Sequence, residues 1–482
     1  MNTSKKLPKW RRQTVSAMLA LTLLIPAASP VLAADAKSVA ADRIAEVLDA
    51  LEKNHVSGPK ADKLSETGIR AMVESLGDPY TQYFTAEQLQ SFEDAVQNQY
   101  VGIGVRVGME EEGVYVADVF AGSPAKEAGM LRGDIIVKVG DETAAGKKID
   151  EVTSKILGPV DTEVRLQVLR DGQTKELTVK RKKVQIPTVV AKRFQNVGYI
   201  EIASFSSDAD ELVSKELSEL KAQGIQSLIV DLRDNPGGLL ETAQQLARLF
   251  VKQGTLIHTR DRNGVDQPVE FANGTTQPFS VFFLVNGNSA SASEVLTGAL
   301  QDYGAITAIG TKTFGKGSVQ NVIPLKSGGA IKVTIEEYLT PKLRKVNQVG
   351  LEPDKKVEGA MAQLLTAIRA AGASRIDLTL DRHSATVNGT EVQDSFDVIR
   401  ENGQTYVPAR VMAALLGASV EWNEAARSVQ LVAGDAKTTY TPAAADFVLK
   451  NGMGYLNVTQ TAAAFNGLSW KDDGKTLTLG AN

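Results

Sequence analysis

A cluster of small polar residues at 286–294, with one glutamate, is the part of this sequence best suited to chemistry. The β-branched and aromatic run 279–285 predicts a buried strand, and the spacing of apolar residues over 295–303 predicts a helix. The serines therefore lie where a strand turns into a helix. A helix start presents free backbone N–H groups and the positive end of the macrodipole. A serine there stands beside donors that could hold an oxyanion.

The alternative without catalysis is a helix cap. Ser291 and Glu294 have the spacing of a capping box, whose side chains only satisfy backbone donors at a helix end. Lys316 favours catalysis, since it lies between two glycines in the loop after the predicted strand 305–309. A lysine buried beside a serine can act as a general base once its pKa falls from about 10.4 toward about 7 or 8. Ser/Lys pairs are a known variant of the serine-nucleophile arrangement.

Other chemistries fit less well. The three histidines are His55, His258 and His383, and none lies in a glycine-rich or turn-rich context, although a Ser-His-Asp triad stays open. The absence of cysteine excludes a thiol nucleophile. Residues 310–316 fit the first seven positions of a phosphate-binding P-loop, but Gly317 stands where Ser or Thr must bind magnesium. A predicted strand also follows where a P-loop needs a helix, so no nucleotide and no cofactor is expected.

Three separated motifs resemble those of the carboxyl-terminal processing peptidases, or tail-specific proteases, of serine peptidase family S41. They are Ser-Ala-Ser-Glu at 291–294, Phe-Gly-Lys-Gly-x-x-Gln at 314–320, and Asp-Leu-Arg-Asp-Asn-Pro-Gly-Gly at 231–238. The resemblance runs from about residue 39 to residue 357. It implies an α/β protease core at 184–358 with an inserted PDZ domain.

The resemblance also implies roles for single residues. The family's nucleophile lies twenty-five residues before the lysine, which selects Ser291 when the lysine is Lys316. Gln320 matches the residue that orients the lysine. The oxyanion donors are implied to be the Ala292 N–H and a glycine of the Asn-Pro-Gly-Gly turn, with Gly237 and Gly238 both open.

Asp231, Arg233 and Asp234 precede those glycines. They could supply catalytic carboxylates or form a salt-bridged turn. We expect the structural role, because Pro-Gly-Gly is the element that needs special backbone angles.

Residues 96–183 resemble a PDZ domain, with Gly102, Ile103 and Gly104 in its carboxylate-binding loop and a second signature at 122–134. Successive backbone N–H groups of such a loop bind a terminal carboxylate while the adjoining strand edge pairs with an extended peptide. The expected partners are unfolded or flexible protein C-termini. Residues 156–161 lack the arginine and the second glycine that many relatives carry, which leaves the mode of peptide sensing open.

The first 33 residues read as a secretory signal peptide, with a basic start, an apolar run at 15–25 and small residues before Ala34. An uncleaved anchor is the alternative. Removing the five basic residues of this segment takes the formal net charge from −4 to −9. An acidic mature chain has no general attraction for nucleic acid. The lack of cysteine fits an exported protein, extracellular or in the envelope of a Gram-positive bacterium.

Residues 34–95 predict helices, with Ile44, Val47, Leu48 and Leu51 on one face. We expect this face to be packed, and the family implies that such helices help to form a homodimer.

Residues 376–482 predict a small α+β module with an internal repeat, because Asn402-Gly403, Tyr406 and Trp422 recur forty-eight or forty-nine residues later. The module resembles the domain named after the copper amine oxidase N-terminus. A copper site is not expected, since His383 is its only histidine and cysteine is absent. We expect the tryptophans to belong to the repeat core rather than to a glycan platform.

The fold class is therefore α/β within a multi-domain α+β chain. The function expected is a serine endopeptidase that cleaves proteins near their C-termini, without metal. A catalytically silent PDZ adaptor and a wall-binding protein are the alternatives.

Overall fold

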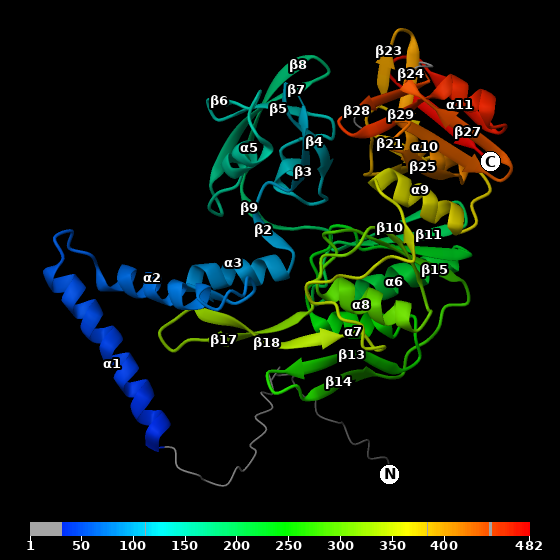
Figure 1. Cartoon of the computed structure of the whole chain (residues 1–482). Helices are drawn as coiled ribbons and strands as arrows, with labels where there is room; N and C mark the ends of the chain where they lie inside the picture. The colour runs from blue at the N-terminus through cyan, green and yellow to red at the C-terminus, as the bar shows by residue number, and fades with distance from the viewer. Residues whose placement is uncertain (1–30, 111, 383, 443–445) are drawn as a thin grey trace, which may run out of the picture. The chain divides into compact units, whose positions relative to one another are not determined.

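The computed structural model describes residues 31–110, 112–382, 384–442 and 446–482, and its contacts divide the chain into two compact units, Met1–Gly77 and Asp78–Asn482 (Figure 1). The predicted signal peptide lies outside the described residues except for its last three, which begin a helix. Among the helices of the described ranges, none is long and apolar enough to cross a membrane.

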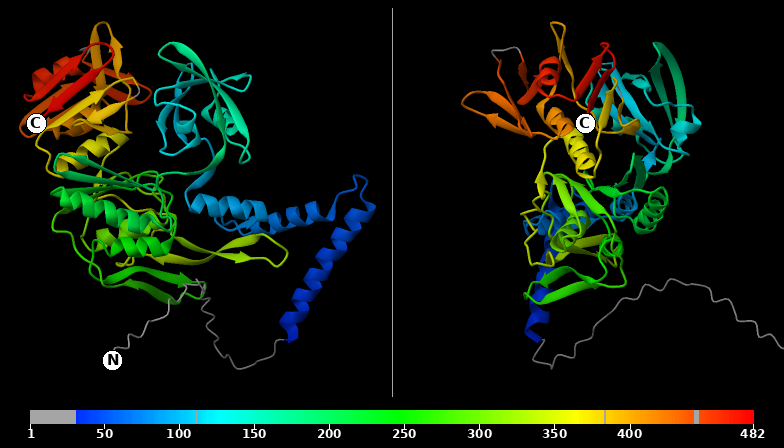
Figure 2. Two further views of the ribbon diagram at one scale, coloured as in Figure 1. Left: turned by 180° about the vertical axis from the view of Figure 1, so that it is seen from behind. Right: turned by 90° about the vertical axis from the view of Figure 1, so that its right-hand side faces the viewer.

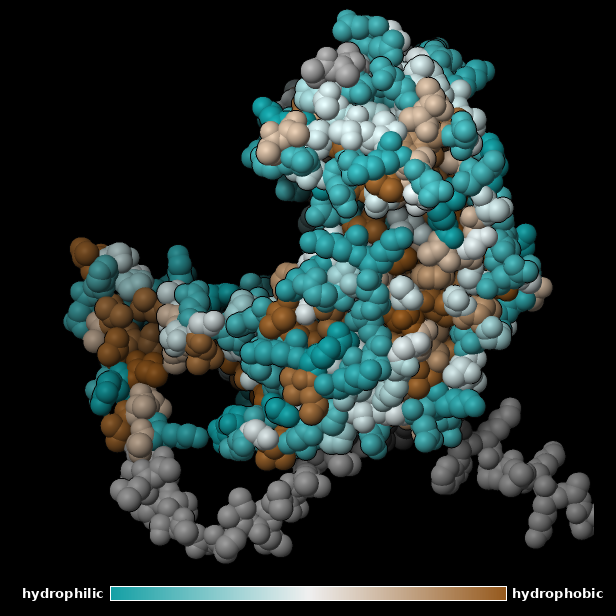
Figure 3. Space-filling view, turned by 45° about the vertical axis from the view of Figure 1, so that its right-hand side comes forward, coloured by the Kyte–Doolittle hydropathy of each residue, from teal (hydrophilic) through white to brown (hydrophobic). Residues whose placement is uncertain are grey.

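The first unit contains α1 (Val31–Asn54) and α2 (Ala61–Glu74). Its apolar face is open: Ile44, Val47 and Leu51 keep 49%, 53% and 38% of their surface exposed. The arm that joins the grey trace in Figure 3 carries this hydrophobic surface. Within residues 31–77 no element covers this face, so the expectation of a packed face is wrong for the single chain.

The centre of the second unit is a six-stranded sheet in the order β10-β11-β12-β15-β16-β19, parallel from β11 onward with an antiparallel edge strand β10. Its central strands are nearly continuous apolar runs, as expected for strands covered on both faces. The strands are β10 (Val189–Phe194), β11 (Val197–Ile202), β12 (Ser227–Asp231), β15 (Ser280–Val285), β16 (Thr307–Gly310) and β19 (Lys355–Lys356).

Helices cover both faces of this sheet. Val230, Phe283 and their neighbours on one face pack against α6, α7 and α8. Ile229 and Leu284 on the other face pack against α9, which lies between the sheet and the C-terminal module in Figures 1 and 2. The helices are α6 (Ala209–Ala222), α7 (Leu240–Ala247), α8 (Ala292–Asp302) and α9 (Ala360–Ala370).

A second sheet has the order β1-β18-β13-β14, with β17 also paired to β18. It matters for the site because β17 follows directly on the loop that carries Lys316. Its elements and the helix before the next domain are β1 (Gln82–Phe84), α3 (Ala86–Val96), β13 (Gly254–Asp261), β14 (Asp266–Phe271), β17 (Ser318–Pro324) and β18 (Ala330–Leu339).

The predicted PDZ domain is a sheet of order β3-β4-β5-β7-β8, with β6 paired to β5, around its own apolar core. The chain enters and leaves this domain on two paired strands, β2 and β9, which suits an insertion. The elements are β2 (Gln99–Gly102), β3 (Val105–Glu110), β4 (Gly113–Val119), α4 (Pro124–Glu127), β5 (Ile135–Val139), β6 (Glu142–Thr143), α5 (Ile149–Ile156), β7 (Glu163–Arg170), β8 (Gln173–Lys180) and β9 (Lys182–Gln185).

Over its described residues, the C-terminal module holds three small sheets, of orders β22-β21-β20-β31-β30, β23-β24-β29-β28 and β25-β26-β27. Its hairpin, helix and strand elements are β20 (Ile376–Leu380), β21 (Ala385–Val387), β22 (Thr390–Val392), β23 (Ile399–Glu401), β24 (Gln404–Pro408), α10 (Ala409–Leu416), β25 (Ser419–Asn423), β26 (Ser428–Ala433), β27 (Ala436–Tyr440), β28 (Phe447–Lys450), β29 (Met453–Asn457), α11 (Val458–Ala464), β30 (Leu468–Asp472) and β31 (Leu477–Ala481).

The repeat is visible as two Asn-Gly hairpins, β23–β24 and β28–β29, each followed by a short helix and a strand. The two copies join through the antiparallel pairing of β24 with β29. Tyr406 and Tyr455 are buried, whereas Trp422 and Trp470 keep 44% and 37% of their surface exposed. The tryptophans were expected in the repeat core, and that expectation is wrong because they lie on the solvent side of β25 and β30. The module's own core is continuous with α9 and one face of the central sheet.

Candidate active site

The predicted nucleophile lies at the carboxyl edge of the central sheet. Strands β12 and β15 are parallel neighbours, with Asp231 opposite Leu284, so the turns that follow them meet at this edge. We call residues 231–238 the oxyanion turn and residues 286–291 the serine turn. Ser291 is the residue before α8 and has φ +54° and ψ −116°, a left-handed conformation that costs a non-glycine residue about 1–3 kcal/mol.

All six residues predicted for the active site line one cavity of about 570 Å³. They come from four segments: the oxyanion turn, the start of α8, the lysine loop and β17. The residues are Ser291, Ala292, Gly237, Gly238, Lys316 and Gln320. The sequence motifs, more than eighty residues apart at their extremes, are thus brought together by the fold.

Burial lowers the pKa of Lys316, against the opposing attraction of the Glu294 charge. The Lys316 Nζ lies 5.4 Å from the centre of the Tyr80 ring, which covers the ammonium with an aromatic face. A second lysine, Lys332, lines the same cavity, and its pKa is lowered by burial and by the charge of Lys316. Sequence reasoning missed both Tyr80 and Lys332, because neither lies within the chemical motifs.

Glu294 does more than cap a helix. Its side chain is fully buried, and one carboxylate oxygen, Oε2, accepts the N–H of Ser291 at 3.0 Å and the N–H of Lys316 at 2.8 Å. The other oxygen, Oε1, accepts the N–H of Gly315 at 2.7 Å and the hydroxyl of Thr313 at 2.5 Å. Burial raises the pKa of Glu294 although these donors oppose the rise. The carboxylate therefore ties the serine turn to the lysine loop.

The two candidate oxyanion glycines differ in their hydrogen bonds. The Gly237 N–H donates to Asn235 Oδ1 at 2.9 Å. Within the described part of the chain, the Gly238 N–H has no hydrogen-bond acceptor. A Cβ on Gly237 would lie 2.8 Å from both the Ala292 nitrogen and the Ser291 Cβ. Gly237 thus allows close approach of the two turns, and Gly238 is the glycine whose donor is open.

Gln320 lies on β17, and its Nε2 donates to the hydroxyl of Ser318 at 2.8 Å. Among the described residues, the Gln320 side chain makes no hydrogen bond to the Lys316 ammonium. Its proposed part in orienting the lysine stays a prediction.

Asp231 and Arg233 form an ion pair in the oxyanion turn and Asp234 is hydrogen-bonded within it, in agreement with the structural role expected for them. The Arg233 guanidinium binds Asp231 through Nε and Nη2, and the Tyr199 hydroxyl donates to Asp231 Oδ2 at 2.8 Å. Asp234 has φ +60° and accepts hydrogen bonds from the side chains of Asn286 and Asn288. Asn286 and Asn288 are both part of the serine turn.

The histidines that the structure describes lie outside the cavity. His258 on β13 is hydrogen-bonded through Nδ1 to Asp266 at 2.9 Å. His55 follows α1 in the first unit, and His383 lies outside the described residues. Neither described histidine lines the cavity of Ser291.

The loop predicted to bind a peptide carboxylate, Gly102 to Gly104, is held by backbone hydrogen bonds and covered by Tyr100. The carbonyl of Ile103 accepts the N–H of Ala125 at 2.8 Å, and the carbonyl of Gly104 accepts the N–H of Phe120 at 3.0 Å, which fixes the loop. The ring of Tyr100 lies over Gly102, where a Cβ would be 2.5 Å from it. Burial raises the pKa of the Tyr100 hydroxyl, and the nearby backbone N–H groups of Gly104 and Val105 act in the opposite direction.

Arg181, between β8 and β9, lies beside residues 156–161 and close to Gly158. Arg181 donates to the carbonyls of Ile156 and Lys155 at the end of α5, at 2.7 and 2.9 Å. Arg181 therefore joins the end of α5 to the junction between β8 and β9.

Three family models match the chain. Peptidase family S41 matches residues 196–357, the PDZ domain matches residues 101–180, and the copper amine oxidase N-terminal domain matches residues 363–431. The first confirms the predicted resemblance of the central sheet and its two turns. The second and third do the same for the inserted domain and the C-terminal module.

The chain is similar to several known proteins. It is 34% identical to a probable CtpA-like serine protease of Staphylococcus aureus over 68% of this chain and 66% of that protein. It is 33% identical to the corresponding protein of Staphylococcus epidermidis, over 68% of this chain and 67% of that one. The chain thus spans about two thirds of the length of these relatives. Among solved structures, the photosystem II D1 C-terminal processing protease matches 68% of this chain and 96% of its own, with 28% identity and a TM-score of 0.43.

Proposed function

The chain belongs to peptidase family S41, and on that premise we propose that it is a serine endopeptidase with a Ser291/Lys316 dyad that cleaves proteins near their C-termini. One observation carries the proposal. Ser291 and Lys316 line one cavity, and their backbones share a single buried carboxylate oxygen. Such a cavity with a lysine of lowered pKa meets the requirements of a serine nucleophile and its general base.

The proposed reaction uses these residues in turn. Neutral Lys316 takes the proton of Ser291 Oγ as that oxygen attacks the carbonyl carbon of the scissile peptide bond. The N–H group of Ala292, at the positive end of α8, and the N–H group of Gly238 in the oxyanion turn hold the oxyanion of the tetrahedral intermediate. Lys316 then protonates the leaving amine, and an acyl-enzyme remains on Ser291. A water molecule, deprotonated by Lys316, attacks the ester, and its hydrolysis restores Ser291.

Substrate recognition is assigned to the PDZ domain. The backbone N–H groups of Gly102, Ile103 and Gly104 would bind the terminal carboxylate of an unfolded or flexible C-terminus. The Tyr100 ring lies over Gly102 in the free chain, so we expect a bound peptide to displace it.

The open apolar face of α1 supports a homodimer, because a face of this kind is normally buried by a partner. Export follows from the signal-like segment 1–33, and we place the mature protein outside the membrane or in the envelope of a Gram-positive bacterium. The exposed Trp422 and Trp470 keep the wall-binding alternative open for the C-terminal module.

The test is hydrolysis of casein, an unstructured substrate, by residues 34–482, with Ser291→Ala and Lys316→Ala in parallel. We expect both variants to lose activity while keeping the circular dichroism spectrum of the parent. An inactive parent that still binds C-terminal peptides would support the silent adaptor. An inactive parent that sediments with purified cell wall would support the wall-binding protein.

A further inference from the structure

We propose that Asp394, in the C-terminal module, is a positioning residue for the oxyanion turn and acts on it through Arg233. The inference rests on the proposed function, and it gives the module a part in the protease site. Three observations support it. An ion pair joins the module to the oxyanion turn, the module packs against the central sheet, and hydrogen bonds connect the oxyanion turn to the serine turn.

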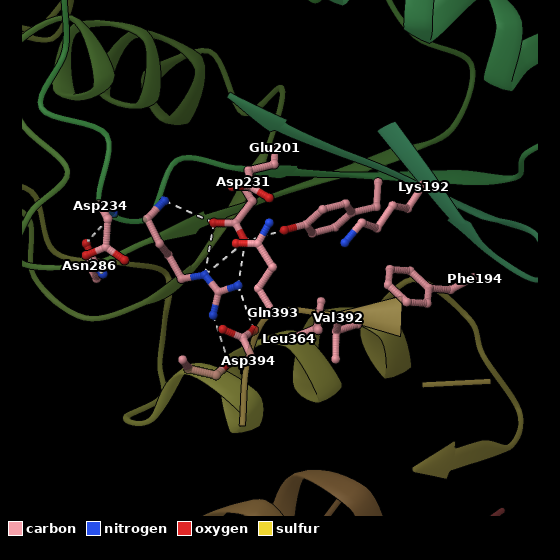
Figure 4. A pocket seen from close by; sticks show the side chains of 13 residues that line it. Lys192, Phe194, Glu201, Asp231, Asp234, Asn286, Leu364, Val392, Gln393 and Asp394 are labelled. Carbon is pink, nitrogen blue, oxygen red and sulfur yellow. Dashed lines mark hydrogen bonds and ion pairs between the residues drawn. The ribbon is translucent and has the colours of Figure 1, made fainter. Parts of the chain in front are cut away.

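The ion pair is short and largely buried. The Arg233 Nη2 lies 2.8 Å from Asp394 Oδ2, and the two side chains keep 8% and 16% of their surface exposed. The same guanidinium binds Asp231 on its other side, and its Nη1 donates to the carbonyl of Ala360 at 2.8 Å. In Figure 4 the labelled Asp231 and Asp394 belong to one cluster of dashed hydrogen bonds. Arg233 is therefore held from three directions, two of them outside its own turn.

The position of Asp394 is fixed by contacts between the module and the central sheet. Asp394 follows β22, whose Thr390 donates its hydroxyl to the carbonyl of Arg193 on β10 at 2.8 Å. Val392 and Leu380 of the module share an apolar core with Ile229 and Leu284 of the central sheet. A shift of the module would therefore move Asp394 relative to β12, and with it the preferred position of the Arg233 guanidinium.

The oxyanion turn transmits this position to the nucleophile. The carbonyl of Asn235 accepts the N–H of Ala290 at 3.1 Å and the hydroxyl of Ser293 at 3.0 Å. The Asp234 N–H donates to Asn286 Oδ1 at 3.0 Å. The open N–H of Gly238 lies four residues beyond Asp234 on the same turn. A displacement of about 1 Å at such a donor can lower a rate by about 100-fold.

The first test is a kinetic comparison of Asp394→Asn with the parent. Asparagine keeps the shape and one acceptor oxygen but loses the charge that fixes the guanidinium. We expect kcat to fall by at least about tenfold with KM nearly unchanged, because the donor acts on the transition state. If Asp394→Asn does not fold, Asp394→Glu is measured in its place. It keeps the charge, so we expect a smaller fall in kcat.

The matched control is Asp472→Asn. Asp472 is a buried carboxylate of the same module, paired with Arg400 at 2.9 Å and without contact to the oxyanion turn. It should leave kcat unchanged. An equal loss in both variants would show a general effect of module stability and would overturn the proposal, as would a folded Asp394→Asn variant with unchanged kcat.

The route through Arg233 is tested by a double-mutant cycle with Arg233→Lys, which keeps the charge but cannot form the fork. In that background Asp394→Asn should add little further loss. If the losses in kcat from the two substitutions add, Asp394 does not act through Arg233.

Amide hydrogen exchange separates a failure of this inference from a failure of the proposed function. Peptides that cover residues 231–238 should exchange faster in Asp394→Asn than in the parent or in Asp472→Asn, whether or not the chain hydrolyses casein. Unchanged exchange in the turn would overturn the inference on its own.

Discussion

The backbone N–H groups of Ser291 and Lys316 donate to the same atom, Oε2 of Glu294, at 3.0 Å and 2.8 Å. The proposed nucleophile and base, twenty-five residues apart in the chain, are thus held by one buried carboxylate. The Ser291-x-x-Glu294 spacing could be explained by a helix cap alone. The structure instead makes the glutamate a joint between the serine turn and the lysine loop.

Glu294→Gln should destabilise the fold by about 2–4 kcal/mol and abolish hydrolysis. A glutamine has one acceptor oxygen, so two of the four donors around the carboxylate would face an amide NH₂ group and stay unsatisfied. Urea unfolding of the variant and the parent measures the change. Glu211→Gln, exposed in the first turn of α6, is the control and should leave both the free energy of unfolding and hydrolysis nearly unchanged.

Lys316→Met should be inactive and more heat-stable than the parent near neutral pH. Burial lowers the pKa of Lys316 in the folded state, so the unfolded chain holds the proton more tightly. The charged lysine therefore destabilises the fold at every pH below its folded pKa, and this penalty disappears as the pH rises from that value to about 10.4. The difference in Tm between variant and parent should shrink over this window. A parent with a higher Tm than Lys316→Met at neutral pH would contradict the assigned effect of burial on Lys316.

Gly237→Ala should remove activity even if the protein folds. The residue has φ +103°, and a Cβ would press on the Ser291 Cβ and the Ala292 nitrogen at 2.8 Å. Gly264→Ala is the matched control, since Gly264 has φ +75° with open space around it. Both substitutions carry a backbone cost of about 1 kcal/mol, but only the first moves the nucleophile. Equal activity of the two variants in a casein assay would argue against close contact of the turns.

Tyr100→Phe should tighten the binding of C-terminal peptides by about fivefold to tenfold. Phenylalanine keeps the ring over Gly102 but removes the hydroxyl that lies near the Gly104 and Val105 N–H groups, which leaves room for a carboxylate. Titration with a fluorescent peptide that ends in a free carboxylate measures the affinity, and the same peptide with an amidated end is the control. Weaker binding by the variant would mean that the hydroxyl contacts the peptide.

Much of the site could be predicted because it lies in local motifs with their own physical reasons. The strand before Ser291, the helix after it and the Pro-Gly-Gly turn are fixed by apolar runs and by backbone angles that glycine permits. The common cavity of Ser291, Lys316 and Gly238 follows from parallel strands whose turns meet at one sheet edge.

The parts that sequence could not supply depend on contacts between distant segments. Tyr80 reaches Lys316 across more than two hundred residues, and Asp394 reaches Arg233 from another module. The choice between Gly237 and Gly238 needed the bond from Gly237 to Asn235, which a sequence motif does not reveal. The tryptophans were misplaced because a repeat pattern marks strand positions without showing which face of a strand is covered.

The most direct test of the Ser291/Lys316 dyad is covalent labelling with a fluorophosphonate, followed by mass spectrometry of the labelled peptide and by its rate at several pH values. We predict a single label on Ser291, a rate that rises with pH along an apparent pKa below the ordinary lysine value, and no labelling in Lys316→Met. A label on another serine, or undiminished labelling of Ser291 in folded Lys316→Met, would contradict the dyad.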